Sequence, residues 1–303
     1  MYKYRGFGLN IASEIPFREF SAYDFSNPAD LEIIRGNTPQ HLSGEDVLRR
    51  ARVEFGKGEY LLKVENIANY YITNGSKAVI ESLTDDEDSI RLFFLSSGIA
   101  AALHQKGKIP LHASGVHNKD GVTLFVGESG AGKSTTVSLL QKIGYRIFTD
   151  DVCVVDNDDL LKDKISVYPS YPVIKLWSNT IDELNIDTDG LNKYKVRRHL
   201  PKVGIVTPDI GTEKLAVGKI IVIRKDNHVS DVSIEPLTGV DVFKQLQKET
   251  YRRNQVDALD IRKEHFRVVS MISSKVPVFV LKRPGNLKSF DDVTDCLNKF
   301  FNE

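Results

Sequence analysis

Alternating apolar and polar residues recur through the first third of the chain, and this period of two predicts β-strands. The expected strands cover residues 5–12, 31–34, 59–67, 70–73 and 77–83. An Asn74-Gly75 pair, a common turn signal, separates the last two segments. Residues 43–57 are mostly polar, so we expect a connection there. The chain should therefore begin with a small antiparallel sheet.

A helical pattern replaces this alternation after four consecutive acidic residues at 85–88. Acidic side chains stabilise the positive end of a helix dipole, so this block should start a helix. Residues 88–107 are rich in Leu, Phe, Ile and Ala and end at a glycine. We place a domain boundary here, between an N-terminal β-rich domain (1–106) and a second domain (107–303).

Strands and helices alternate through the second domain, which is typical of an α/β fold. The expected strands cover residues 109–116, 122–126, 144–155, 215–223, 232–237 and 276–281. The expected helices cover residues 133–143, 178–184, 238–248, 257–274 and 289–301. In this pattern His104 is expected in the core and His265 at the surface.

Residues 187–199 are polar and should form an irregular, mobile connection. This connection ends in four cations, Lys193, Lys195, Arg197 and Arg198. Such a cluster can hold a γ-phosphate or an acidic peptide. A solvated basic face fits the same residues equally well.

Composition narrows the classes of function. The 303 residues include 41 Lys and Arg and 41 Asp and Glu, so no net basic field favours nucleic acid. Cys153 and Cys296 lie far apart without metal-binding spacing, as expected for thiols of a reducing cytoplasm. Neither a secretory signal nor a membrane-spanning stretch is recognisable. We expect a cytoplasmic protein with no membrane or nucleic-acid partner, and the oligomeric state stays open.

The most specific motif is Gly127-x-x-x-x-Gly132-Lys133-Ser134, the P-loop pattern, between a predicted strand and a predicted helix. Its glycines let backbone N–H groups turn toward phosphate oxygens, and the following helix N-terminus favours the same anion. Lys133 should reach the β- and γ-phosphates of a nucleotide, and Ser134 should ligate Mg²⁺. The expected nucleotide site comprises Gly127, Glu128, Ser129, Gly130, Ala131, Gly132, Lys133, Ser134 and Thr135.

Two acids and a histidine are candidates to complete this site. Asp150 and Asp151 interrupt the strand expected at 144–155, one helix and one strand after the P-loop. A carboxylate in this position can direct Mg²⁺ or activate a nucleophile. His112 precedes the P-loop by one strand, and by itself it fits a core histidine more readily than a catalytic one.

Together the blocks 111–116, 127–135 and 149–151 resemble the kinase domain of bacterial HPr kinase/phosphorylase. That family phosphorylates a serine of a protein, and its P-loop domain is related to phosphoenolpyruvate carboxykinases. The resemblance implies a P-loop kinase that uses ATP and Mg²⁺, with catalytic residues Asp150, Asp151, His112 and Lys133. It implies that Asp150 is the base for the acceptor hydroxyl, that Asp151 joins Ser134 at the metal, and that His112 tunes the acids.

The chain also departs from that family. The family's glutamate-bearing signature has no match, and residues 168–177 occupy its place. Residues 171–177 of this segment and the opening at 4–16 resemble the kinases of lasso-peptide gene clusters, which phosphorylate the C-terminal serine of a precursor peptide. That resemblance implies a serine-bearing peptide as partner. The alternatives left open are a kinase of another protein or of a small-molecule hydroxyl, and a non-catalytic nucleotide-gated regulatory module.

Overall fold

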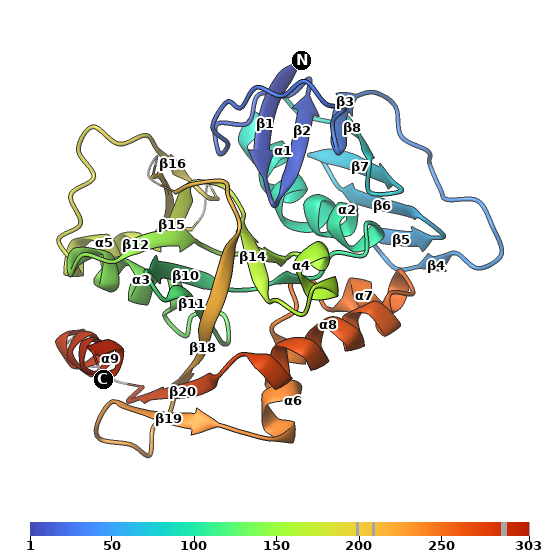
Figure 1. The fold of residues 1–303 in the computed structure, drawn as a ribbon. Coiled ribbons are helices and arrows are strands. Elements are labelled where there is room, and N and C mark those ends of the chain that lie inside the picture. The colour runs from blue at the N-terminus through green and yellow to red at the C-terminus, as the bar shows by residue number, and fades with distance from the viewer. Residues whose placement is uncertain (198–199, 208–209, 286–289, 303) are drawn as a thin grey trace.

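The computed structural model describes residues 1–197, 200–207, 210–285 and 290–302, and it is a mixed α/β protein (Figure 1). The N-terminal strands, blue in the figure, lie beside a larger body formed by the rest of the chain. No helix in the described part is long and apolar enough to cross a membrane. The expected α/β class is confirmed, and the domain division at residue 106 stays a prediction.

The first body is built on an eight-stranded sheet, counted over the described residues, in the order β1-β2-β3-β8-β7-β6-β5-β4. Its strands are β1 (Tyr2–Gly6), β2 (Leu9–Ser13), β3 (Leu31–Arg35), β4 (Leu48–Arg49), β5 (Val53–Gly56), β6 (Glu59–Val64), β7 (Ala68–Thr73) and β8 (Lys77–Ser82). Buried and less buried positions alternate along β2 and β7, as a sheet with one covered face requires. The apolar pattern of the sequence therefore located most of this sheet.

Three expectations about this sheet were wrong. The sheet is mixed and not purely antiparallel, because β3 pairs in parallel with both β2 and β8. The strand expected at 5–12 is a hairpin, because Phe7 and Gly8 both adopt positive φ and reverse the chain. The Phe7 ring is fully buried against Tyr171 of the second body, and this packing offsets the cost of its backbone conformation. The connection expected at 43–57 contains β4 and β5, which extend the sheet at its far edge.

The helix expected after the acidic block is confirmed, although it is not regular. It comprises α1 (Glu87–Phe93), the π-helical segment η1 (Phe94–Gly98) and α2 (Ile99–Gln105). Asp86 caps its start by accepting a hydrogen bond from the Ser89 backbone at 3.4 Å. Its buried face packs on the sheet, and the same core includes Val152 and Tyr171 from the second body. One hydrophobic cluster therefore extends from the first body into the second.

The second body centres on a nine-stranded sheet, counted over the described residues. Its strands are β9 (Pro110–Leu111), β10 (Ser114–Asn118), β11 (Gly121–Val126), β12 (Arg146–Thr149), β13 (Cys153–Val155), β14 (Ser166–Pro169), β18 (Leu215–Lys225), β19 (Ser233–Leu237) and β20 (Val278–Arg283). Strands β11, β18 and β20 are parallel neighbours at its centre. The strand expected at 109–116 is thus divided into β9 and β10, which pair with different partners.

Helices cover this sheet, and a small sheet stands beside it (Figure 1). The helices are α3 (Lys133–Lys142), α4 (Asn157–Leu161), α5 (Ser178–Glu183), α6 (Val240–Lys248), α7 (Asn254–Ala258), α8 (Arg262–Lys275) and α9 (Asp291–Asn302). The small sheet has the order β15-β17-β16. Its strands are β15 (Val173–Trp177), β16 (Lys193–Lys195) and β17 (Lys202–Val206).

Three further expectations need correction. Part of the connection expected at 187–199 is strand β16, and Arg198 lies outside the described residues. The helix expected at 257–274 is divided between α7 and α8, because Asp260 adopts a positive φ of 54°. His265 is buried, with Nε2 2.7 Å from the Thr250 hydroxyl, because α8 turns this face toward the core.

Candidate active site

The predicted P-loop is the turn between β11 and α3. Gly127 has a φ of 137°, and a Cβ there would lie 2.6 Å from the carbonyl oxygen of Ile223 on β18. Gly132 has a left-handed φ of 110° and forms the N-cap of the ten-residue α3. Both conformations favour glycine, and they bring the loop onto the helix N-terminus, where backbone N–H groups attract an anion.

Lys133 folds back across this loop. Its Nζ donates to the carbonyl oxygens of Gly127 at 2.7 Å and Glu128 at 3.3 Å. Burial lowers the pKa of Lys133, while the nearby carboxylates of Glu249, Asp151 and Asp150 oppose that shift. The ammonium is therefore held over the cradle, where it can neutralise phosphate charge.

A buried glutamate that the sequence analysis missed holds the first residue of the loop. Glu249 follows α6, and its carboxylate accepts from Gly127 N at 3.1 Å and from Gln245 Nε2 at 2.6 Å. Its carbonyl oxygen accepts from His112 N at 2.6 Å. Nothing in the sequence around Glu249 predicts its contacts with Gly127 and His112, because these two residues are more than 100 residues away. Glu249 thus connects the P-loop with the strand segment that carries His112.

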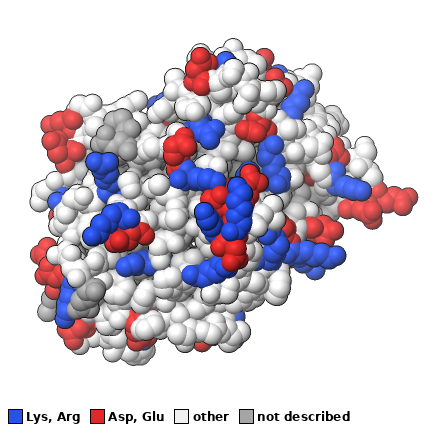
Figure 2. Space-filling model, in the orientation of Figure 1, with Lys and Arg blue, Asp and Glu red and all other residues white. Residues whose placement is uncertain are grey.

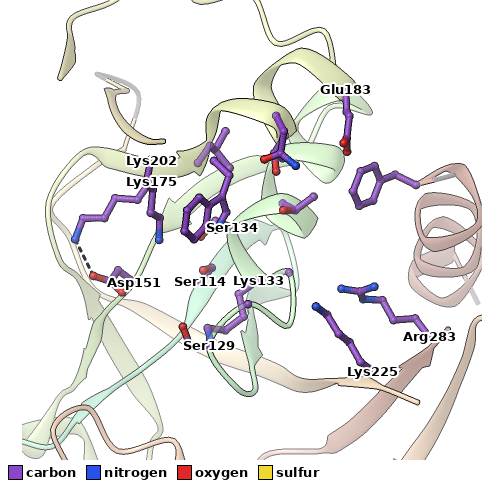
Figure 3. Close-up of a pocket in the computed structure, with 18 of the residues that line it drawn as sticks. Ser114, Ser129, Lys133, Ser134, Asp151, Lys175, Glu183, Lys202, Lys225 and Arg283 are labelled. Carbon is purple, nitrogen blue, oxygen red and sulfur yellow. Dashed lines mark hydrogen bonds and ion pairs between the residues drawn. The ribbon is translucent and has the colours of Figure 1, made fainter. Parts of the chain in front are cut away.

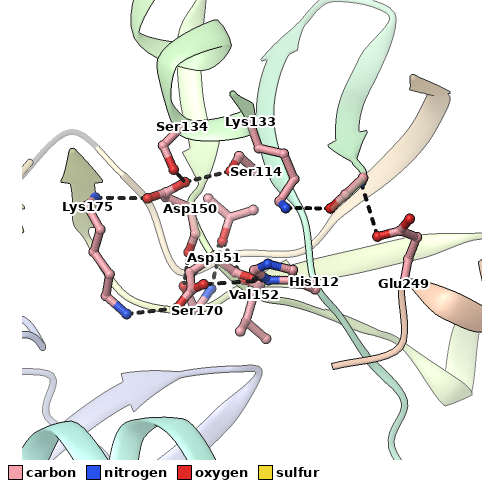
Figure 4. Close-up of polar contacts among 12 residues, drawn as sticks. His112, Ser114, Lys133, Ser134, Asp150, Asp151, Val152, Ser170, Lys175 and Glu249 are labelled. Atoms are coloured by element: carbon pink, nitrogen blue, oxygen red, sulfur yellow. Dashed lines mark hydrogen bonds and ion pairs between the residues drawn. The ribbon is translucent and has the colours of Figure 1, made fainter. Parts of the chain in front are cut away.

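Asp150 is aimed at the start of α3 (Figure 4). Its Oδ1 accepts from Ser134 Oγ at 2.8 Å and from Ser114 Oγ at 2.6 Å, and its Oδ2 accepts from Lys175 N at 2.8 Å. The residue is only 1% exposed. Burial with three donors fixes the carboxylate beside the serine hydroxyl that was predicted to ligate Mg²⁺.

Asp151 points elsewhere, although it is the next residue. It adopts a φ of 72°, and its Oδ2 lies 2.7 Å from Lys175 Nζ. His112 Nδ1 donates to its carbonyl oxygen at 2.8 Å and lies 3.5 Å from its Oδ1. Burial raises the pKa of Asp151, but the charges of Lys175 and His112 outweigh burial and hold that pKa well below its usual range. The carboxylate is therefore ionised at neutral pH.

Lys175 is the second residue that the sequence analysis missed. It occupies the middle of β15, where buried Ile174 and Leu176 flank it. A cation inside the apolar run 173–177 is the sequence signal that could have identified it, because a buried charge requires a partner. The attraction of Asp151 raises the pKa of Lys175 above its usual value despite burial. The acid pair predicted from sequence is thus a cluster of two acids, a histidine and a lysine.

Two cavities meet at the P-loop. One of about 570 Å³ extends from Asp151, Lys175 and Lys202 past the loop toward Lys225 and Arg283 (Figure 3). The other, about 870 Å³, lies between the loop and α6 and includes Glu249. Cations thus stand at both ends of the first cavity, with the P-loop between them. This space can take an anionic ligand at the loop and a second ligand near Asp151.

The basic residues predicted as a clamp do not share one location. Lys193 donates to the Thr188 hydroxyl at 2.9 Å, and Lys195 lines a separate cavity of about 20 Å³ beside the N-terminal helices. Lys202 of β17, which was not singled out, instead lines the cavity of about 570 Å³, as Lys175 of β15 does. On the face shown in Figure 2, basic and acidic side chains are interspersed.

The donor set of the site suits a hard cation. Ser134 and Asp150 offer a hydroxyl and a carboxylate oxygen, which are ligand types that Mg²⁺ prefers. In the described part of the chain, no group of three or more His, Cys, Asp or Glu side chains could hold a metal. A Mg²⁺ ion here would be held by one or two protein oxygens together with nucleotide phosphates.

Comparisons with known proteins return little. No family model matches the sequence, and no curated protein matches it. Among solved structures, the chain is similar to the Hpr(Ser) kinase/phosphatase from Coxiella burnetii, with 10% sequence identity and a TM-score of 0.33. The match covers 64% of this chain and 96% of that chain. Likeness of this degree says nothing about the substrate or activity of this chain.

Proposed function

We propose that this chain is an ATP- and Mg²⁺-dependent phosphotransferase that transfers the γ-phosphoryl group to a hydroxyl, with a P-loop domain of the HPr kinase and phosphoenolpyruvate carboxykinase type. One observation carries this proposal: the Ser134 hydroxyl donates to Asp150 at 2.8 Å at the N-terminus of α3, beside Lys133. Phosphoryl transfer by P-loop enzymes uses a serine or threonine hydroxyl and an acid to hold Mg²⁺ and a lysine to bind the phosphates.

The chain's residues would divide the work as follows. Backbone N–H groups of 127–135 and the α3 dipole hold the phosphates, and Lys133 neutralises charge on the transferring group. Ser134 and Asp150 would hold Mg²⁺, which supplies further neutralisation of the phosphates. The contacts of Asp150 with Ser134 favour the role of metal ligand for Asp150, whereas the family resemblance implied that it is the base.

Asp151 is then the carboxylate that lies beside the acceptor hydroxyl and takes its proton. It is ionised, it is positioned by His112 and Lys175, and it faces the cavity. The acceptor oxygen bonds to the γ-phosphorus while the bond from that phosphorus to the β-bridging oxygen breaks, and ADP leaves. The acceptor hydroxyl proton passes to a carboxylate oxygen of Asp151.

We propose further that the acceptor hydroxyl belongs to a serine. Because residues 4–16 and 171–177 resemble the lasso-peptide kinases, we propose the C-terminal serine of a lasso-type precursor peptide. Incubation with γ-³²P-ATP tests both the transfer reaction and the class of acceptor. Label on a peptide indicates a peptide kinase, label on a metabolite indicates a small-molecule kinase, and label only on free phosphate indicates neither. Lys133→Ala should lower transfer about a hundredfold to a thousandfold, as expected when one preorganised donor is lost. Transfer near the wild-type rate by folded Lys133→Ala would refute the phosphotransferase.

A further inference from the structure

One edge of strand β15 faces the active-site cavity. In the small sheet β15 pairs with β17 on one side and is terminal in the strand order. Three consecutive residues, Lys175, Leu176 and Trp177, line the cavity. Side chains of a strand alternate between its two faces, so three consecutive lining residues mean that the cavity meets the edge of the strand.

Hydrogen bonds show which backbone groups point outward from this edge. Ser178 N donates to Pro201 O at 2.8 Å and Thr207 N donates to Pro172 O at 2.8 Å, so residues of even number bond toward β17. Lys175 N instead donates to Asp150 Oδ2 at 2.8 Å, away from β17. Because strand N–H and C=O directions alternate, the C=O of Lys175 and the N–H of Trp177 share this outward direction.

These two groups have the spacing that strand pairing uses. A C=O on one residue and an N–H two residues later can accept and donate to a single residue of a parallel incoming strand. The Asp150 contact with Lys175 N places this pair of groups directly beside the acid cluster. In this pairing the bound residue lies opposite Leu176, so its own side chain is on the Leu176 face, while the side chains of its two neighbours are on the face of Lys175, which contacts Asp151.

The charge of the cavity beside β15 indicates which kind of peptide can bind there. Lys202 is the cross-strand partner of Trp177, and its Nζ lies 5.9 Å from the centre of the indole ring. Lys202 and Lys175 both line the cavity here. Because Lys175 is paired with Asp151, Lys202 is left to interact with a chain bound along the edge. A carboxylate on that chain would be complementary to Lys202.

We propose that the outward edge of β15 at Lys175 and Trp177 binds the main chain of an extended, acidic peptide and presents its hydroxyl residue to Asp151. This assignment rests on the proposed phosphotransferase. Main-chain hydrogen bonds supply the affinity and require an extended segment of the partner. A folded acceptor whose hydroxyl lies in a helix would not fit this edge.

The test uses short acidic serine peptides and γ-³²P-ATP, first with the full wild-type chain. Trp177 has a φ of −73° and follows a strand residue, so Trp177→Pro fits the backbone and removes the N–H. Trp177→Ala also removes the indole but keeps the N–H, and it is the matched control. We expect the peptide KM of Trp177→Pro to exceed that of Trp177→Ala about threefold to tenfold, as one hydrogen bond is lost. Equal KM values in the two variants would overturn the proposal.

A second arm avoids any question of folding, because it alters the peptide and uses the wild-type chain. Replacing the amide N–H of the peptide residue bound opposite Leu176, next to the accepting serine, by an ester oxygen removes the donor to Lys175 O. This change should raise KM about threefold to tenfold. An unchanged KM, or a small hydroxyl compound that reacts as well as the peptide, would overturn the edge proposal while leaving the phosphotransferase standing. If no compound accepts label, the phosphotransferase itself fails, and the edge proposal falls with it.

Discussion

The ion pair between Lys175 and Asp151 makes a prediction about stability that does not depend on the reaction. Lys175→Met keeps the length and the backbone N–H but removes the charge. At 2.7 Å and an effective dielectric constant of about 20, the two charges attract by about 6 kcal/mol. Desolvation of both ions offsets much of this, and breaking a buried pair costs about 3–5 kcal/mol. Because 24% of the Asp151 side chain is exposed, we expect a loss of about 2–3 kcal/mol.

A double-mutant cycle isolates this interaction. Urea unfolding, followed by circular dichroism, is measured for the wild type, Lys175→Met, Asp151→Asn and the double variant. The double variant should be nearly as stable as Asp151→Asn, because Lys175→Met costs little once the carboxylate is gone. Lys195→Met, an exposed change on the neighbouring strand β16, is the control and should stay within about 0.5 kcal/mol of the wild type. A coupling energy below about 0.5 kcal/mol would refute the buried pair.

Three further predictions concern the acids, the P-loop and pH. Asp151→Asn should lower the rate of transfer about 10²- to 10⁴-fold. Asp150→Asn should chiefly raise the Mg²⁺ concentration that gives a half-maximal rate. If steady-state kinetics show the opposite pattern, Asp150 is the base. Glu249→Ala should weaken Mg-ATP binding by calorimetry more than Glu249→Gln, which keeps an acceptor for the loop N–H; equal affinities would contradict this role. Burial lowers the pKa of His104 and of His265 to about 4, so the unfolded chain binds more protons below about pH 6.5. The free energy of unfolding should therefore fall between pH 6.5 and 4, by up to about 3 kcal/mol for each histidine, and a flat urea profile over this range would refute it.

The parts of the fold that the sequence predicted are those governed by local signals. The Asn74-Gly75 turn, the acidic helix start at 85–88 and the P-loop each act through neighbouring residues. The hairpin at Phe7-Gly8 was not recognisable, because a phenylalanine at positive φ is stable here only through its packing on Tyr171. The burial of His265 likewise depends on Thr250, which lies beyond its own helix.

The candidate site also contains residues that local sequence signals predicted and residues that they did not. The sequence located the P-loop and the acid pair, but it could not predict how each acid is oriented. Lys175 and Glu249 come from segments 24 and 122 residues away from Asp151 and Gly127, the groups that they contact. Such contacts form only when the fold brings β15 to the acid pair and the end of α6 to the P-loop. No periodicity within either segment encodes them.

The two neighbouring acids can serve different partners because one backbone conformation separates them. Adjacent carboxylates would repel each other if both faced the same cavity wall. The φ of 72° at Asp151 turns the chain, so that Asp150 meets the hydroxyls of Ser114 and Ser134 while Asp151 meets Lys175 (Figure 4). Aspartate and asparagine tolerate this conformation better than most residues, which makes Asp151→Asn a change of charge without a change of backbone. Asp151→Ala would combine the lost charge with backbone strain, and its effect on transfer could not be assigned to the carboxylate.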